Sequence, residues 1–592
     1  MPLAGTEFAA DTRGGAILIT LRRRRDGGMD GNLQFSTVQS NRIAGYTPSG
    51  RIGIRTGRWT LTASGSGSFT PVAESRFTET REQAGQPLPF AGRSDSKSRT
   101  NYGRGHFSAV FDPTPKHTAG FDIEYTERST HMPTLSRTTL GQTQSDSRYR
   151  QHMDGNTLTA TANYIWKIDT LGSQFKLIAD YTRYTSDGDN SYHTTTCAPG
   201  TLRDSLYESA TGSVYDILTA DAGLTRKLPH GLTLRAGLRY TRNDMADKSR
   251  YAAQTQGTWL ALPEYSYDQH YTEQIGAAYA SLEYSAGRWE LSAGLRGEYT
   301  SVASQAFGRS YFGLFPNVSV SRALNALRTW LLVAQWSRNI ERPAFPALNP
   351  ARIRISDYSW QSGNPSLRPT YIHRFSLTAV WKYRYTLTVG GNLHHDLIRE
   401  IAHRDATAPD AVYIRPENHY TENHWFVAAS VPAKITRWWN LSVNAVGVMQ
   451  RIRLNSTDSP ATHYLMFADA TCSFTLPAGF FAEAVYRAQS RLYSGNSEVG
   501  PRHTLSATVK KQLFGKRLTL FCTLSNITGC DWEFASLTDG MRRTIDTGQA
   551  WSGRLWKVGA AWNFRTGKKF RARTVESAAE TQRKRLVKST EQ

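Results

Sequence analysis

Hydrophobic and polar residues alternate one by one through many segments of this chain. The segment 232–242 is a clear case, and 289–300 repeats it with aromatic residues at both ends of its apolar face. Because successive side chains of a strand point to opposite faces, this period of two predicts β-strands. We expect the apolar faces to meet lipid and the polar faces, rich in Arg, Glu and Thr, to line a lumen. The apolar positions are Leu232, Leu234, Ala236, Leu238, Tyr240, Trp289, Leu291, Ala293, Leu295 and Tyr299.

The breaks between these segments are alternately short and long along the whole chain. Ten short turns and eleven long polar stretches predict 22 strands. Transmembrane antiparallel barrels sort their connections in this way, with tight turns on one rim and long loops on the other. A soluble β-sandwich, the alternative, leaves this sorting unexplained. The short turns are 57–58, 113–116, 167–173, 227–231, 285–287, 324–327, the break near 385, 434–437, 477–479 and 515–516, and the long stretches include 71–104, 129–155, 185–213, 244–273, 341–370 and 399–423.

The predicted fold is therefore all-β, a single large transmembrane barrel over residues 26–565. Its last strand, 556–564, presents Trp556, Trp562 and Phe564 on one face and closes the barrel against the first strand, near 31–40. The charged residues 566–592 are predicted to be a disordered periplasmic tail. The first fifteen residues lack the apolar core of a signal peptide, so we expect either an upstream start or a fragment.

The formal net charge is +22, from 71 basic and 49 acidic residues. Nucleic-acid binding is not supported, because no helix-turn-helix, zinc-finger or aromatic RNA-binding motif accompanies the charge. We interpret it as a positive lumen or vestibule that attracts anionic ligands. No stretch approaches the ~18 apolar residues of a membrane-spanning helix. Aromatic residues make up 11% of the chain, which suits girdles at the two membrane interfaces.

No catalytic motif stands out, so we predict that the protein is not an enzyme and has no cofactor. A weak cluster of soft ligands falls in two neighbouring long stretches that should be extracellular. Imidazole, thioether and thiolate groups suit copper or a haem-like guest, but loops of this length also collect such residues by chance. These metal candidates are His131, Met132, His152, Met153, His193 and Cys197.

One proline-rich stretch, 337–369, must leave the barrel wall. Proline cannot donate to a sheet ladder, Gly363-Asn364-Pro365 is a turn signal, and Asn349 suits a bond to nearby backbone. Two interpretations stay open: a structured loop that shapes the barrel mouth, or direct ligand contact by Arg342, Tyr358 or Trp360. The residues that define this motif are Arg342, Pro343, Asn349, Pro350, Gly363, Asn364, Pro365, Leu367 and Pro369.

Two segments resemble a known family. Residues 5–23, GTEFAADTRGGAILITLRR, look like the final strands of the plug domain of TonB-dependent receptors. The motif SRNIERPAFPALNP at 337–350, followed by SGNPSLRP at 362–369, resembles the mid-barrel signature of Bacteroidetes-type outer-membrane receptors. The resemblance covers about 5–564 and implies a bacterial outer-membrane barrel with a plug remnant at 1–25. Most of the plug and the segment that contacts TonB are missing from the pattern.

The resemblance implies import of a ligand across the outer membrane when a plug is present. The implied partners are outer-membrane lipid, the barrel-assembly machinery, an unknown small-molecule, glycan or peptide ligand, and the TonB complex only for a full-length form. Three alternatives stay open: a plugless passive pore, a surface binding or adhesion barrel, and a truncated non-functional remnant. The fold does not identify the ligand.

Overall fold

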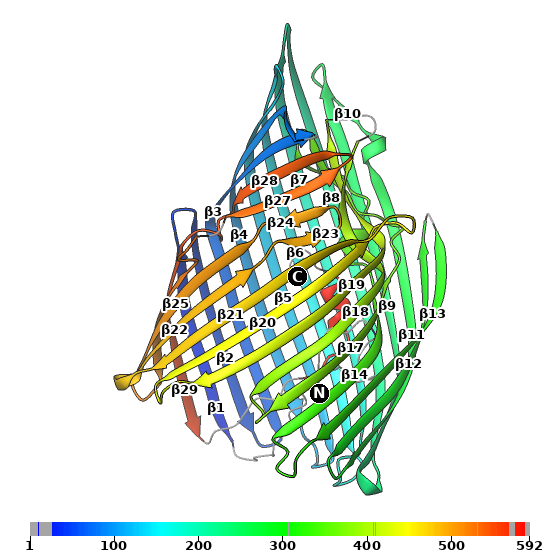
Figure 1. Cartoon of the computed structure of the whole chain (residues 1–592), viewed down its shortest axis with the longest axis vertical. Helices are drawn as coiled ribbons and strands as arrows, with labels where there is room; N and C mark the ends of the chain where they lie inside the picture. Colours follow the sequence, from blue (N-terminus) through cyan, green and yellow to red (C-terminus); the bar gives the residue numbers. More distant parts are fainter. Residues whose placement is uncertain are drawn as a thin grey trace.

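The wall of the molecule is one closed ring of antiparallel strands. The computed structural model describes residues 10, 27–83, 85–305, 307–405, 408, 410–529, 531–567 and 575–586. Within this part of the chain 22 strands form the wall (Figure 1), as the sorted connections predict. They are β1 (Gly28–Gln39), β2 (Ile43–Thr56), β3 (Trp59–Gln83), β4 (Gln86–Phe111), β5 (His117–Leu140), β6 (Thr143–Lys167), β7 (Gln174–Ala198), β8 (Thr201–Lys227), β9 (Leu232–Thr255), β11 (Tyr267–Ala286), β12 (Trp289–Ser304), β13 (Gly308–Ala323), β14 (Trp330–Glu341), β17 (Thr370–Trp381), β18 (Tyr385–Arg404), β19 (Val412–Lys434), β20 (Trp439–Arg453), β21 (Ala461–Thr475), β22 (Phe480–Gln489), β25 (Arg502–Leu513), β26 (Leu518–Ser525) and β29 (Leu555–Gly567).

The first and last wall strands pair and close the barrel. Gly31 lies opposite Phe564, and Leu33 lies opposite Trp562. Trp556 pairs with Gln39 at the other end of the same ladder. A Cβ on Gly31 would overlap the Phe564 ring, so glycine allows that ring to lie across β1. The predicted closure of 556–564 against 31–40 is confirmed.

Inward and outward faces alternate as the sequence pattern predicts. On β9, Leu234, Leu238 and Tyr240 are exposed on the outer surface, whereas Thr233 and Thr241, on the inward face, are buried. On β12, the outward residues Trp289, Leu291, Leu295 and Tyr299 are likewise exposed, and the inward residues Arg296, Glu298 and Thr300 are buried. A single period-2 pattern therefore separates lipid contacts from lumen contacts. Among the described residues, no helix is long and apolar enough to span a membrane.

The predicted long loops are in large part strands, and this corrects the sequence-based picture. Strands β3 to β9 are 24 to 27 residues long. The stretches 129–155 and 185–213 are β-hairpins that turn at Gly141 and Gly200, where φ is 59° and 74°. Beyond the membrane the outward face of such ribbons meets water instead of lipid and is polar, whereas inward residues such as Ser147 and Tyr149 are buried. The apolar alternation therefore disappears although the backbone ladder continues.

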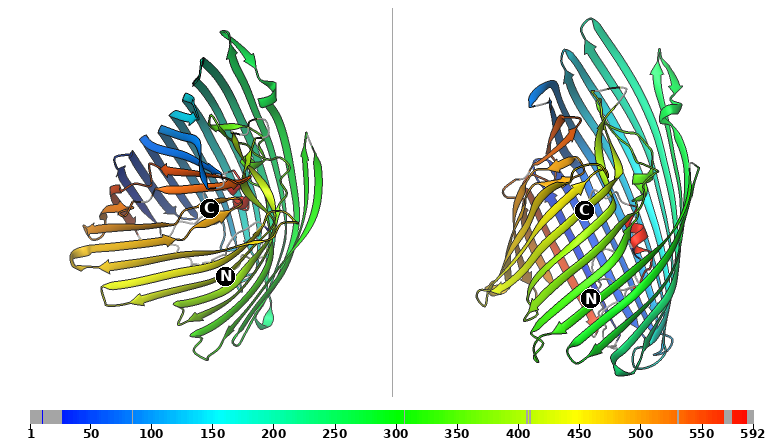
Figure 2. Two further views of the ribbon diagram at one scale, coloured as in Figure 1. Left: turned by 45° about the horizontal axis from the view of Figure 1, so that its top comes forward. Right: turned by 45° about the vertical axis from the view of Figure 1, so that its right-hand side comes forward.

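Several segments fold into the barrel mouth instead of projecting from it (Figures 1 and 2). Strand β16 pairs in parallel with β19, β28 pairs with β3, and β24 pairs with β27. The additional elements are β10 (Thr258–Ala261), β15 (Ile353–Ser356), β16 (Ser359–Gln361), β23 (Leu492–Ser494), β24 (Ser497–Val499), β27 (Trp532–Thr538), β28 (Met541–Gly548), α1 (Phe345–Leu348), α2 (Glu580–Lys584) and the short 3-10 turns η1 (Pro229–Gly231), η2 (Pro263–Tyr265) and η3 (Pro477–Gly479).

Only part of the two predicted terminal regions lies within the described residues, and both regions stay predictions. Of the predicted plug remnant 1–25, only Ala10 lies within the described residues. Its carbonyl accepts a hydrogen bond from the Ile340 backbone amide at 3.2 Å. Of the predicted tail 566–592, residues 575–586 form α2 and its flanks, with Gln582 and Arg585 buried. This part of the tail is ordered against the wall, because buried carboxylates there receive its polar groups.

Candidate ligand-binding mouth of the barrel

The proline-rich motif packs against part of the inner face of the barrel wall. After β14 ends at Glu341, the chain turns inward, and Phe345, Leu348 and Leu367 become buried. They pack in one hydrophobic cluster with inward side chains of the wall, and the proline positions interrupt the ladder so that the wall resumes only at β17. The wall members of the cluster are Tyr215, Ile217, Met245, Tyr271 and Val302.

Arg342 fastens the start of this segment to the wall. Its Nη2 donates to Glu298 Oε2 at 2.7 Å and to Thr300 Oγ1 at 3.0 Å. Arg296 Nε donates to the other oxygen of Glu298 at 2.6 Å, so one buried carboxylate bridges two buried guanidiniums. This arrangement favours a structural role for Arg342 over ligand contact.

The turn signal of the motif is a close backbone contact. The Asn364 amide donates to the Ala347 carbonyl at 2.7 Å, and its side chain donates to the Pro416 carbonyl at 3.0 Å. A Cβ on Gly363 would overlap the Asn349 carbonyl oxygen and stand 2.8 Å from that of Ala347. The Asn349 side chain accepts from the Ala351 amide at 2.9 Å, which is the local backbone bond expected for it. The remaining motif prolines, Pro343, Pro350, Pro365 and Pro369, lie in the same segment between β14 and β17.

Arg354 and Asp357 attach the β15–β16 hairpin to the extended strands of the wall. Asp357 accepts from Ser147 Oγ at 2.6 Å, Tyr149 OH at 2.8 Å and Thr194 Oγ1 at 3.2 Å. Arg354 Nη2 donates to the same carboxylate at 2.6 Å. Burial and the Asp357 charge raise the pKa of Tyr149, so this hydroxyl stays a donor.

Aromatic rings surround the arginines of this hairpin. The Arg354 guanidinium carbon lies 5.3 Å from the centre of the Trp360 ring and 5.6 Å from that of Tyr207. Arg352, which is partly exposed, lies 5.4 Å from the Tyr265 ring and 5.9 Å from the Trp360 ring. Guanidiniums over aromatic faces provide charge, hydrogen-bond donors and stacking surfaces together. We call Arg352, Arg354, Tyr207, Tyr265 and Trp360 the arginine–aromatic patch.

A second ionic contact holds β28 in the mouth. Arg543 Nη2 donates to Glu79 Oε2 and to Ser359 Oγ, both at 2.8 Å. Arg81 Nε donates to Glu79 Oε1 at 2.9 Å and also contacts the Asp410 carbonyl. Burial opposes ionisation of Glu79, but the attraction of Arg543 and Arg81 outweighs it and holds the pKa of that carboxyl below its usual value. The contact joins β3, β28 and β16.

The sequence-predicted metal candidates do not converge. His131 and His152 are cross-strand partners with ring centres 6.3 Å apart, and Met153 lies opposite Thr130. His193 pairs with Arg148 and Cys197 with Gln144, further along the ribbon. Met132 lies opposite Gln151. Over the described ranges, no group of three or more His, Cys, Asp or Glu side chains is arranged to hold a metal ion.

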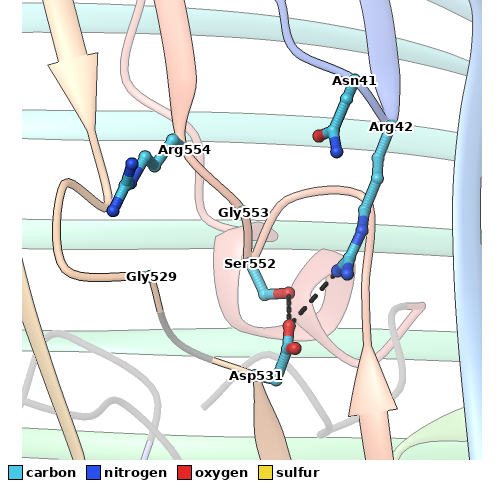
Figure 3. A pocket seen from close by; sticks show the side chains of 7 residues that line it. All are labelled: Asn41, Arg42, Gly529, Asp531, Ser552, Gly553 and Arg554. Atoms are coloured by element: carbon cyan, nitrogen blue, oxygen red, sulfur yellow. Dashed lines mark hydrogen bonds and ion pairs between the residues drawn. The ribbon is translucent and has the colours of Figure 1, made fainter.

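A separate pocket of about 460 Å³ lies at the seam between the first and last strands (Figure 3). Arg42 and Ser552 both point at Asp531, at 3.2 and 2.9 Å, while the Arg554 side chain lies apart from them. Polar and charged residues line the pocket, but it contains no aromatic ring among its described residues, and its central carboxylate is paired with Arg42. It is less suited to an anionic ligand than the arginine–aromatic patch.

Sequence patterns do not point to several of these residues. Glu273 and Arg585 form an ion pair although they are 312 positions apart, and no sequence pattern distinguishes either of them from other charged residues. One feature of the sequence could have indicated an interior charged site: Glu273 and Glu298 both fall on the inward faces of two neighbouring strands.

Comparison with known proteins gives consistent results. A model of the outer membrane protein beta-barrel family matches residues 166–559. The siderophore receptor PirA from Pseudomonas aeruginosa is similar in structure, with a TM-score of 0.57, 13% identity, and coverage of 95% of this chain and 85% of that one.

Two further solved structures show the same fold. A ferric enterobactin receptor mutant from Pseudomonas aeruginosa in complex with enterobactin has a TM-score of 0.59, 13% identity and coverage of 95% and 85%. The copper transporter OprC has a TM-score of 0.57, 12% identity and coverage of 92% and 82%. No curated protein matches the chain.

Proposed function

The chain belongs to the outer membrane protein beta-barrel family, and from that premise we propose that it takes part in importing a small anionic ligand that carries planar or aromatic groups. The family membership confirms the predicted resemblance and the location in a bacterial outer membrane. The similar structures are transport receptors, not enzymes.

The observation that carries the proposal is the arginine–aromatic patch. Concave sites with aromatic walls and a few fixed polar groups are the usual form of small-ligand sites. Here Arg354 is held in place by Asp357. Arg352 Nη2 lies 3.8 Å from Asp405 Oδ2, and the Arg352 side chain is partly exposed beside Trp360 and Tyr265. A formal charge of +22 adds long-range attraction for anions. Ligands with several hydroxyl or carboxylate groups around an aromatic ring fit this chemistry.

The test is ligand binding to the purified full chain in detergent micelles, followed by tryptophan fluorescence. Ferric enterobactin serves as the anionic aromatic probe and Cu²⁺ as the contrasting one. We expect ferric enterobactin to bind and Arg352→Ala to weaken binding by roughly 10- to 100-fold, because a hydrogen bond to a charged group contributes about 1.5–3 kcal/mol.

The matched control is Arg437→Ala, which removes one exposed charge at a short turn on the opposite rim. It should leave binding unchanged. Equal weakening by both variants would mean that net charge alone attracts the probe. No binding of any anionic aromatic probe, with Cu²⁺ bound instead, would overturn the proposal.

A further inference from the structure

The C-terminal segment 575–586 lies inside the ring of wall strands (Figure 2). The Ala578 amide donates to Asp180 Oδ2 on β7 at 2.7 Å. Lys176 Nζ, on the same strand, is 2.6 Å from Glu576 Oε2. Further along, Asn243 Nδ2 on β9 donates to Gln582 Oε1 at 3.2 Å. The segment thus crosses the inner face of the wall and bonds to β7 and β9, on either side of β8.

Arg585 makes the densest contacts of the segment. Its Nη1 donates to Glu273 Oε2 on β11 at 2.5 Å, and its Nε donates to the Pro343 carbonyl at 3.0 Å. Its own carbonyl accepts from the Phe345 amide at 2.9 Å, and its guanidinium carbon lies 4.2 Å from the centre of the Phe345 ring. One residue therefore joins the tail, the wall and the inward motif.

The wall surface under residues 575–586 carries acidic side chains that accept hydrogen bonds from this segment. Glu273 is 1% exposed and Asp180 2% exposed, although both are on the face that borders the lumen. Each carboxylate accepts a hydrogen bond from the wall, Asp180 from Thr161 Oγ1 and Glu273 from Asn243 Nδ2. Because a buried carboxylate needs further partners, the donors of the segment complete these two sites. The outer side of α2 carries Glu580 and Lys584, which pair with each other and are exposed. The segment has one face for the wall and one for the lumen.

We propose that residues 575–586 act as an intrachain plug. They dock on the lumen surface formed by Asp180, Asn243 and Glu273, hold the motif at Pro343–Phe345 against the wall, and restrict passage through the barrel. A 22-stranded barrel is wide enough to conduct unless its lumen is filled. The inference goes beyond the proposed ligand import, since it concerns permeability of the barrel with no ligand bound.

The docked position is tested first, in the unmodified full chain. A zero-length carbodiimide joins an amine to a carboxylate that touches it, so it should link Lys176 to Glu576. Mass spectrometry of the digested protein is expected to show that linked peptide pair. Lys176→Ala should abolish it. Absence of the linked peptide from folded wild-type protein would overturn the proposal.

Permeability is tested by conductance in planar lipid bilayers. We expect the full chain to be mostly closed, and a chain that stops after residue 574 to conduct continuously. Arg585→Ala should also open the barrel, because breaking a buried ion pair shifts docking by roughly 100-fold or more. Lys584→Ala, on the exposed side of the same helix, should behave as the wild type.

Folding of each variant is checked by heat-modifiable migration on gels. If the shortened chain fails to fold, Arg585→Ala and the crosslink still decide the question. Equal conductance of the full chain and Arg585→Ala, with the crosslink retained in both, would show that Arg585 does not control closure. Continuous conductance of the full chain would show that the segment is no plug.

Discussion

The membrane-facing wall and the interior of this barrel use opposite chemistry. Leu238 stands 65% exposed on β9 and contacts lipid, while Glu298, on a neighbouring part of the ring, is 2% exposed and bonded to two arginines. The wall is stabilised by backbone pairing and by apolar contacts with lipid, which tolerate exchange of one apolar side chain for another. The interior depends on particular charged partners, so a change there removes a specific bond. An exposed apolar side chain is therefore favourable in the wall, whereas a buried charged side chain in the interior requires its specific partners.

The largest effect is expected where an interior carboxylate bridges two buried cations. Glu298→Ala leaves Arg296 and Arg342 buried without their shared partner and should cost about 3–5 kcal/mol of unfolding free energy. Asp95, which is exposed and pairs with Arg76 and Arg93, is the matched control. Asp95→Ala should cost at most ~1 kcal/mol. Urea unfolding in detergent micelles measures both, and equal losses would remove the distinction between interior and surface ion pairs.

The wall itself contains a second contrast, between two leucines of similar exposure. Leu238 lies in the membrane-spanning part of β9, and Leu135, 62% exposed, lies far along β5 in a water-exposed ribbon. Leu238→Arg should destabilise the barrel by about 2–4 kcal/mol, because it places a charge in lipid. Leu135→Arg should change stability by less than ~0.5 kcal/mol. Unfolding from lipid vesicles measures both; a large loss for Leu135→Arg would place that ribbon in the membrane.

The wall could be predicted from the sequence because its rules are local. Period-2 alternation and turn residues fix the strands, their faces and the short turns, and they place Trp556 and Phe564 on the closing strand. The sequence predicts loops where the ribbons lie, because their outward face meets water and is polar, which removes the apolar alternation while the ladder continues. The amino-acid composition therefore distinguishes the membrane-spanning wall from the water-exposed ribbons. It does not show that the ribbons are still β-strands.

The interior could be predicted only in outline. Gly363-Asn364-Pro365 marks a turn, and the prolines show that the chain leaves the wall, so an inward or outward loop follows from local rules. The pairing of Arg585 with Glu273 depends on closure of the whole ring, which brings residues 312 positions apart together. No local pattern contains that information. The predicted soft-ligand cluster, which includes His131 and Cys197, rests on nearness in the sequence, and the register of the ribbon separates its members.

A smaller effect is expected at the tight turn of the motif. Gly363→Ala would bring a Cβ onto the Asn349 carbonyl and near that of Ala347, and both are backbone atoms that cannot rotate away. We expect a loss of about 1–3 kcal/mol and a shifted inward segment. Gly103→Ala, on β4, is the control because its Cβ would meet nothing within 4 Å. Limited proteolysis of the motif and urea unfolding report the two effects, and an unchanged Gly363→Ala protein would show that the motif is loosely held.

The smallest effect is a pH dependence of the mouth, through Glu79. Its pKa is lowered in the folded chain, because Arg543 and Arg81 outweigh the opposing effect of burial. A depressed carboxyl pKa stabilises the folded state above the ordinary value of 4.5, and that contribution is lost as the pH falls through the folded pKa. The advantage of the wild type over Glu79→Gln should therefore be constant near neutrality and shrink below about pH 4.5. Hydrogen exchange of β28 against pH measures it, with exposed Glu82→Gln as the control on the same strand. If the two variants followed the same acid profile, the Glu79 contact would contribute nothing to holding β28 in the mouth, and closure there would depend on backbone pairing, as it does in the wall.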